Sequence, residues 1–284
     1  MNHLFLFISL VFLLLAQNKE AKKDSIVYGW KHNVYSKLGI INTSFDNWQR
    51  GGDNALAWRI ETYAQFNETQ KSYKWQNSGK FVYGKTKLGS QEIRNTSDEI
   101  KISSVYTQIL GENGSILNPY VSFTFITQFS AGFNYDSIPP KQISNFMDPG
   151  YVTEAIGLRY SPGELFSLRM GFSAKQTFTK EFSFTADDKE TSEIERNKYE
   201  YGLELSSELE TDVSDNIQFS SKLQVFSNLE AINQVDVDWD NYFISPLSKY
   251  ISVNLNMAIF YDRDFSKKRQ LKSVFSLGIS YTFL

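Results

Sequence analysis

The chain contains no cysteine and only two histidines among its 284 residues. Without cysteine it forms no disulfide, has no thiolate nucleophile or cysteine-ligated metal site, and cannot carry the lipid of a lipoprotein. His3 directly precedes the apolar N-terminal run, so His32 is the one histidine of the remaining sequence. A hydrolase that activates serine or aspartate chemistry with a histidine therefore has no such base in the second half of the chain.

Long apolar runs are also scarce. Residues 4–16 read LFLFISLVFLLLA, which is shorter than the roughly 20 apolar residues that a spanning helix needs. Followed by a polar stretch, this run predicts a secretory signal peptide over residues 1–20, with an uncleaved anchor as the alternative. No later run approaches spanning length, which argues against a mature helical membrane protein.

The chain lacks a dominant charge of either sign, with a formal net charge of −3. It has no basic field that would attract nucleic acid, so nucleic acid is not an expected partner. It also lacks EF-hand spacing and a glycine-rich phosphate loop, and no cofactor is indicated. Aromatic residues nevertheless make up 15% of a chain whose mean hydropathy is −0.36. That combination is typical of a membrane β-barrel, in which only every second strand residue faces lipid.

The clearest positive signal is the two-residue alternation of the last thirteen residues, KSVFSLGISYTFL. Successive side chains of a strand point to opposite faces, so this segment carries an apolar row and a row of small polar groups. An aromatic residue near the C-terminus is typical of the closing strand of an outer-membrane barrel, although Leu284 follows it here. The predicted lipid-facing assembly row is Phe275, Leu277, Ile279, Tyr281 and Phe283.

Similar alternation recurs from residue 34 to residue 284 and predicts an all-β protein, a single transmembrane antiparallel up-and-down barrel of about 12 strands. Alternation sustained over nine or more residues is long enough for a tilted spanning strand. An apparent change of phase at Ser103–Ser104 predicts a bulge. The expected strands are 34–46, 54–69, 73–88, 98–110, 118–131, 151–161, 165–178, 198–210, 216–228, 234–245, 249–262 and 271–284.

The lengths of the connections alternate as well. Short links such as 161–164 alternate with longer or more charged links such as 179–197. Outer-membrane barrels place short turns in the periplasm and longer loops outside, which predicts that both termini are periplasmic. Residues 21–33 are then a periplasmic segment that precedes the barrel.

Charged residues of both signs fall on the predicted lumen rows. They could pair with one another and restrict the bore, or they could line a pathway for a small polar solute. Barrels of about eight strands are filled by side chains and those of about sixteen enclose channels, so a twelve-strand barrel leaves both readings open. The ten predicted lumen-lining charges are Arg59, Glu61, Lys80, Arg159, Arg169, Lys175, Glu200, Glu204, Glu208 and Lys222.

Carboxylates are also predicted to gather at the outer mouth. Oxygen clusters of this kind suit hard cations such as Ca²⁺, although a solvated acidic rim neutralised by the nearby basic residues is the alternative, and no metal is assigned. The residues concerned are Asp236, Asp238, Asp240, Asp262 and Asp264.

Two loops at the same end are distinctive. Trp48, Gly51 and Gly52 suit a tight outer hairpin with an interfacial aromatic anchor. Residues 132–150 contain three prolines and form either a plug that folds into the lumen or a cover over the rim.

Three segments together resemble an uncharacterised family of Bacteroidota outer-membrane β-barrels, a domain of unknown function. They are WQRGGDNALAW, VDVDWDN with the following SKYISVNLNMAIFYDRD, and GISYTF. The resemblance implies an outer-membrane barrel and carries no assigned activity or catalytic residue.

The sequence therefore predicts a non-enzymatic integral outer-membrane barrel, either a narrow channel for small polar solutes or a structural envelope protein. The alternatives are a rim enzyme that works through Asp, Glu or Ser, and a secreted soluble β-protein that binds a ligand. Expected partners are outer-membrane lipid, lipopolysaccharide and the barrel-assembly machinery, and the oligomeric state is left open.

Overall fold

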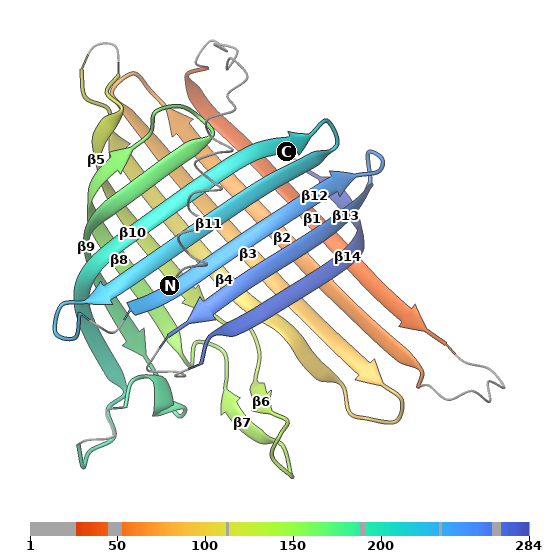
Figure 1. Cartoon of the computed structure of the whole chain (residues 1–284). Helices are drawn as coiled ribbons and strands as arrows, with labels where there is room; N and C mark the ends of the chain where they lie inside the picture. Colours follow the sequence, from red (N-terminus) through yellow and green to blue (C-terminus); the bar gives the residue numbers. More distant parts are fainter. Residues whose placement is uncertain are drawn as a thin grey trace.

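The barrel is built from twelve long antiparallel strands that close on themselves (Figure 1). The structure is a computed structural model, and it describes residues 27–44, 53–111, 114–187, 191–232, 235–262 and 268–283. Within these ranges no helix has the length and apolarity to cross a membrane. The predicted fold class and the predicted number of barrel strands are confirmed.

Each barrel strand pairs with its neighbours in chain order, except that β5 pairs with β8, and β1 pairs with β14 to close the barrel. The strands β6 and β7 form a separate two-stranded sheet. The bounds are β1 Gly29–Thr43, β2 Ala55–Thr69, β3 Tyr73–Leu88, β4 Arg94–Gln108, β5 Leu117–Thr127, β6 Gly132–Asn134, β7 Lys141–Ser144, β8 Gly150–Tyr160, β9 Phe166–Phe178, β10 Asn197–Ser214, β11 Ile217–Asn228, β12 Val235–Pro246, β13 Ile251–Tyr261 and β14 Gln270–Thr282.

The first strand begins earlier than the sequence predicts, at Gly29 rather than at residue 34. Gly29 pairs with Thr69, and His32 pairs with Phe66, so residues 29–33 belong to the barrel and not to a preceding segment. The polar residues of this stretch break the apolar alternation in the sequence. Their backbone amides and carbonyls are nevertheless paired with the backbone of β2, and this pairing is what makes the stretch a strand.

Ser103–Ser104 is not a bulge. Ser104 occupies an outward position, where it accepts a hydrogen bond of 2.9 Å from Trp75 Nε1 and donates one of 2.8 Å to Asn77 Oδ1. Two neighbouring polar groups thus satisfy the hydrogen-bonding capacity of Ser104 on the apolar face. Because this position is polar, the alternation of apolar residues is interrupted in the sequence although the strand is regular. The register of β3 and β4 shifts instead between Gly84 and Lys85.

The outer surface of the barrel is apolar, and the inner surface is polar. Leu203 is 46% exposed on the outside, whereas Glu204 and Ser206 of the same strand are buried inside. On β14 the predicted assembly row is exposed throughout, from Phe275 and Leu277 to Phe283 just beyond the strand end.

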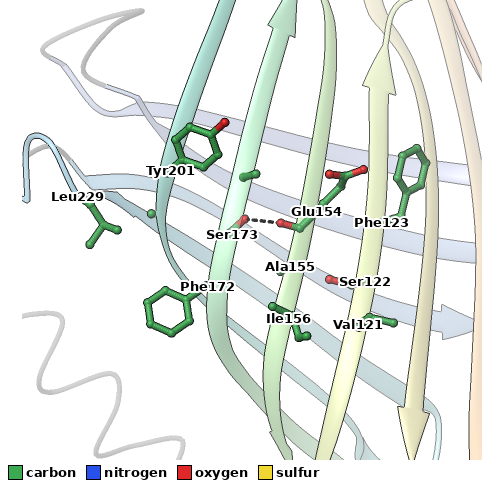
Figure 2. A pocket seen from close by; sticks show the side chains of 12 residues that line it. Val121, Ser122, Phe123, Glu154, Ala155, Ile156, Phe172, Ser173, Tyr201 and Leu229 are labelled. Carbon is green, nitrogen blue, oxygen red and sulfur yellow. Dashed lines mark hydrogen bonds between the residues drawn. The ribbon is translucent and has the colours of Figure 1, made fainter.

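At one place on the wall, small residues let strands approach closely. Gly157 and Gly171 face each other, and a Cβ on Gly157 would lie 2.1 Å from the Met170 carbonyl oxygen. Glycine is therefore required there. Nearby, the outer surface is hollowed into a groove of about 520 Å³, which holds the exposed Glu154 (Figure 2). Large apolar groups surround it: Val121, Phe123, Ile156, Phe172, Tyr201 and Leu229.

Candidate functional site

The lumen has two halves, which we name by the ends of the barrel. The terminal end is where β1 begins and β14 finishes, and the loop end is opposite, where the connections from β5 to β8 and from β9 to β10 lie. All ten charged residues predicted for the lumen occupy inward positions, and they divide between the two halves.

In the terminal half, side chains fill the bore around Arg169. Its Nη2 lies 3.3 Å from Glu208 Oε1 and donates a hydrogen bond of 3.0 Å to Ser206 Oγ. The Lys222 ammonium reaches the same Glu208 oxygen at 2.9 Å, and the Arg169 guanidinium lies 5.6 Å from the centre of the Tyr120 ring. Tyr120 is 2% exposed and Ser206 is 1% exposed, so the wall around Arg169 is closely packed, whereas the side chains of Glu208 and Lys222 stay 36% and 35% exposed.

A second arginine crosses the same half. Arg159 on β8 donates to Gln76 on β3, and its Nε lies 3.1 Å from Ser161 Oγ. The partners Arg159 and Gln76 belong to strands that are not adjacent in the sheet, so this contact runs through the lumen. Together with the Arg169 network it narrows the bore in this half of the barrel.

At the loop end, three carboxylates surround the ammonium of Lys175. Its Nζ lies 2.8 Å from Asp236, 3.7 Å from Asp262 and 4.0 Å from Glu200. The Glu200 carboxylate also receives Lys198 at 3.0 Å. Two residues of the predicted acidic cluster, Asp236 and Asp262, therefore lie around a cation from β9.

This arrangement differs from the predicted cation site. In the part of the chain that the structure describes, no group of three or more Asp, Glu or His side chains is placed to hold a metal ion. Asp236, Asp238 and Asp240 follow one another along one strand at intervals of about 7 Å, which is too far for one ion whose ligands lie within about 2.6 Å. Asp264 lies outside the described residues, as does the predicted hairpin of Trp48, Gly51 and Gly52.

The Lys175 cluster lines a cavity of about 430 Å³ at the loop end of the lumen. Five of its charged lining residues were not predicted from the sequence: Asp98, Glu99, Lys101, Lys198 and Lys272. Alternation with Ile100 and Ile102 was the available signal for Glu99 and Lys101 on β4. The charged lining is Arg59, Lys80, Asp98, Glu99, Lys101, Lys175, Lys198, Glu200, Asp238, Asp240, Asp262 and Lys272.

Loop 132–150 does not plug the lumen. Its β6–β7 hairpin extends away from the end of the barrel in Figure 1, and no residue of 128–149 lines the cavity. Thr185, from the connection between β9 and β10, lines it instead. Buried Asp148 joins the two loops, because its carboxylate accepts the backbone N–H groups of Lys180 at 2.9 Å and Glu181 at 2.7 Å. Of the two predicted roles, the inward plug is wrong, and the loop lies at the rim.

Two family models match the chain. One, described as "Protein of unknown function, DUF481", matches residues 142–283, which is half of the chain. The other, "Protein of unknown function (DUF3078)", matches residues 40–133. Both agree with the expectation of an uncharacterised family. No curated protein matches the chain.

Solved outer-membrane barrels are similar at low identity. An outer membrane channel from Pseudomonas putida F1 is 10% identical, with a TM-score of 0.39, and the match covers 94% of this chain and 99% of that chain. The translocator domain of the autotransporter NalP from Neisseria meningitidis is 10% identical, with a TM-score of 0.39 and coverages of 91% and 90%. The porin KdgM is 7% identical, with a TM-score of 0.34 and coverages of 89% and 100%. Likeness at these scores carries no inference about solute or activity.

Proposed function

Since the chain belongs to the family of proteins of unknown function DUF481, whose description names no activity, we propose its function from the geometry of the barrel. It is a non-enzymatic integral outer-membrane barrel that passes small polar solutes through a narrow lumen. The observation that carries the proposal is the division of the lumen into a charged cavity of about 430 Å³ at the loop end and a packed ion-pair network at the terminal end.

The packed half acts as the constriction. Arg159 and Arg169 are long side chains on neighbouring strands. Hydrogen bonds and an ion pair hold them in place. Rotation of such side chains needs no change in the strands. A small solute that enters the cavity would thus pass when these two side chains turn aside.

The membrane setting is part of the proposal. Support comes from the exposed apolar outer face, which would be costly in water and fits the hydrocarbon region of a bilayer. We place both termini in the periplasm and the loop end outside, and we assign residues 1–20 to a signal peptide and the source to the Bacteroidota. Lipopolysaccharide would contact the exposed aromatics near the loop end, and the barrel-assembly machinery would read β14.

The absence of an enzymatic role is also proposed. His32, the histidine outside the predicted signal peptide, stacks on Trp30 at 5.8 Å and contacts Phe66 at 5.4 Å. These are outward-facing aromatics near the terminal end, remote from the charged cavity at the loop end. Of the carboxylates at the loop end, Asp236, Asp262 and Glu200 are engaged by Lys175, and Asp148 is engaged by backbone N–H groups.

The test is swelling of liposomes that contain the refolded protein, measured with a graded series of small polar solutes. The proposal expects uptake of the smallest solutes and a sharp fall as solute size exceeds the constriction. Equal exclusion of every solute would favour a structural envelope protein. Recovery of the native protein in the soluble fraction, without heat-modifiable mobility on gels, would instead support a secreted soluble β-protein.

A further inference from the structure

The charges that line the cavity at the loop end are balanced. Its lining holds six cationic side chains and six carboxylates, and some of them pair directly, as Lys80 does with Glu99 at 2.8 Å. A permeating ion meets both signs there and gains no consistent preference from this half of the lumen. Any selection between anions and cations therefore has to come from the narrower terminal half.

The carboxylates of the terminal half are few. Arg169 and Lys222 share a single one, Glu208, at 3.3 Å and 2.9 Å. Glu204, which lies on the same inward row of β10, is 8% exposed and buried against the wall. One shared carboxylate and one buried carboxylate thus serve this part of the bore.

Two further cations reach this part of the lumen with neutral partners only. Arg159 donates to the amide of Gln76, and its other hydrogen-bonded partners are hydroxyl groups. Lys101, at the boundary with the cavity, donates to Gln224 Oε1 at 3.2 Å, and Gln224 lies two residues from Lys222 on the inward row of β11. Four cations therefore face two carboxylates, which leaves an excess of two positive charges.

The opposite wall does not remove this excess. In the ring of twelve strands β1 lies opposite β9, and its Lys37 donates to the neutral side chain of Asn254 at 3.3 Å. Glu61 on β2 pairs with Arg59 and is also the register partner of Lys37. One carboxylate again serves two cations.

The approach from the terminal end carries both signs equally. Lys31 and Lys74 occupy inward positions on β1 and β3. Glu210 and Asp212 follow Glu208 along the inward row of β10. These two pairs of charges offset each other, so the excess of positive charge belongs to the narrow part itself.

Fixed charge along a narrow bore selects ions of the opposite sign, because low-dielectric walls concentrate its field, and rings of arginine and lysine are the usual lining of anion pores. Arg159 and Lys222 are partly exposed to the lumen, and an arginine keeps its charge throughout the accessible pH range. We propose that the lumen is selective for small anions and that Arg159, Arg169 and Lys222 are the residues that select them. The inference rests on the proposed function, because it names the class of solute that the narrow lumen passes.

The experiment measures the reversal potential of the refolded full-length protein in planar bilayers under a gradient of potassium chloride. Chloride should be more permeant than potassium by about fivefold, the ratio expected for one uncompensated cation about 4 Å from a passing ion in water. Equal permeabilities, or a preference for potassium, would overturn the inference.

Variants of one arginine separate its charge from its packing. Arg159→Gln removes an unpaired cation and should lower the ratio of chloride to potassium permeability. Arg159→Lys keeps the charge and should keep most of the preference, although it loses the planar guanidinium. The same fall in both variants would mean that the arginine acts through its shape, and the inference would fail.

The shared carboxylate gives a change in the other direction. Glu208→Gln leaves Arg169 and Lys222 without a counter-charge and should raise the preference for chloride. Lys85→Gln is the control, because Lys85 lies 5.6 Å from the centre of the Tyr83 ring on the outer face of β3 and should not affect the ratio. Heat-modifiable gel mobility shows that each variant is folded. Lys222→Gln, which should lower the ratio, serves if Glu208→Gln does not fold.

Selectivity and conduction are separate readouts. Conductance without a preference for chloride would keep the proposed function and sink this inference alone. The absence of any conductance from the native protein would sink the proposed function, and the anion pathway with it.

Discussion

The ammonium of Lys175 on β9 lies 2.8 Å from the carboxylate of Asp236 on β12, and this ion pair crosses the lumen. Two strands, β10 and β11, separate the partners along the wall. A single lysine side chain can bridge them only where the bore is narrow. The same lysine keeps Asp236, Asp262 and Glu200 from acting as a metal site, since it occupies the space between them.

Replacing this lysine should create a cation site. In Lys175→Met the three carboxylates lose their shared counter-charge, and oxygen-only clusters bind Ca²⁺. Millimolar Ca²⁺ should then raise the melting temperature of the variant but not that of the wild-type protein. Lys222→Met, which removes a lumen lysine from the other half, is the control. A Ca²⁺ response that is the same in all three proteins would contradict the account.

An outward polar cluster stabilises β11 and β12. Trp239 Nε1 donates to Ser221 Oγ at 3.0 Å, and Ser221 Oγ lies 2.9 Å from Asn241 Oδ1. Ser221→Ala removes the hydrogen bonds to Trp239 Nε1 and Asn241 Oδ1 on the apolar face and should lower the free energy of unfolding by about 1–3 kcal/mol. Urea titration in liposomes measures the change. Ser207→Ala, at an outward position where the serine side chain has no hydrogen bond to a described residue, should be close to neutral, and equal losses would count against the cluster.

Glu154 is a charge on the apolar face of the barrel. It lies in the outward groove of Figure 2, opposite Phe123 in the register. Glu154→Leu should stabilise the protein in a bilayer by roughly 1 kcal/mol, since carboxylates cost less there than the 2–4 kcal/mol of a basic residue. Glu208→Leu removes a lumen carboxylate that pairs with two cations and should destabilise it. A stabilising Glu208→Leu together with a destabilising Glu154→Leu would reverse the assignment of faces.

Arginine substitutions test the same assignment at mid-strand. Leu203→Arg points into lipid and should cost about 2–4 kcal/mol of unfolding free energy. Ser206 is a poor lumen control, because it is 1% exposed and accepts a hydrogen bond from Arg169. Ala258→Arg faces the cavity beside Asp240 and should cost less than Leu203→Arg. Equal costs would show that the two positions share an environment.

Local patterns in the sequence were enough to predict the strands and their faces. On β10, the apolar residues Tyr199, Tyr201 and Leu203 alternate with Glu200 and Glu204. A period of two in a strand indicates directly which side chains share a face. The prediction was wrong where a polar residue sits on an apolar row and is satisfied by neighbours, as at Ser104, or where pairing continues through polar residues, as at His32.

Contacts across the lumen could not be predicted in this way. Lys101 and Gln224 are 123 residues apart and meet because the closed barrel brings β4 opposite β11. The sequence around each residue does not indicate that the two side chains meet. The acidic residues of β12 show the same limit, since their sequence spacing suggested a shared ion, whereas the fold brings Lys175 to Asp236 from another strand.

The most direct test of a narrow, gated lumen is single-channel conductance of the refolded protein in planar bilayers, compared with the double variant Arg159→Ala/Arg169→Ala. The account predicts a small conductance for the wild-type protein and a larger one for the variant, because the two arginines form the constriction in the terminal half. No conductance from either protein under any condition would contradict it.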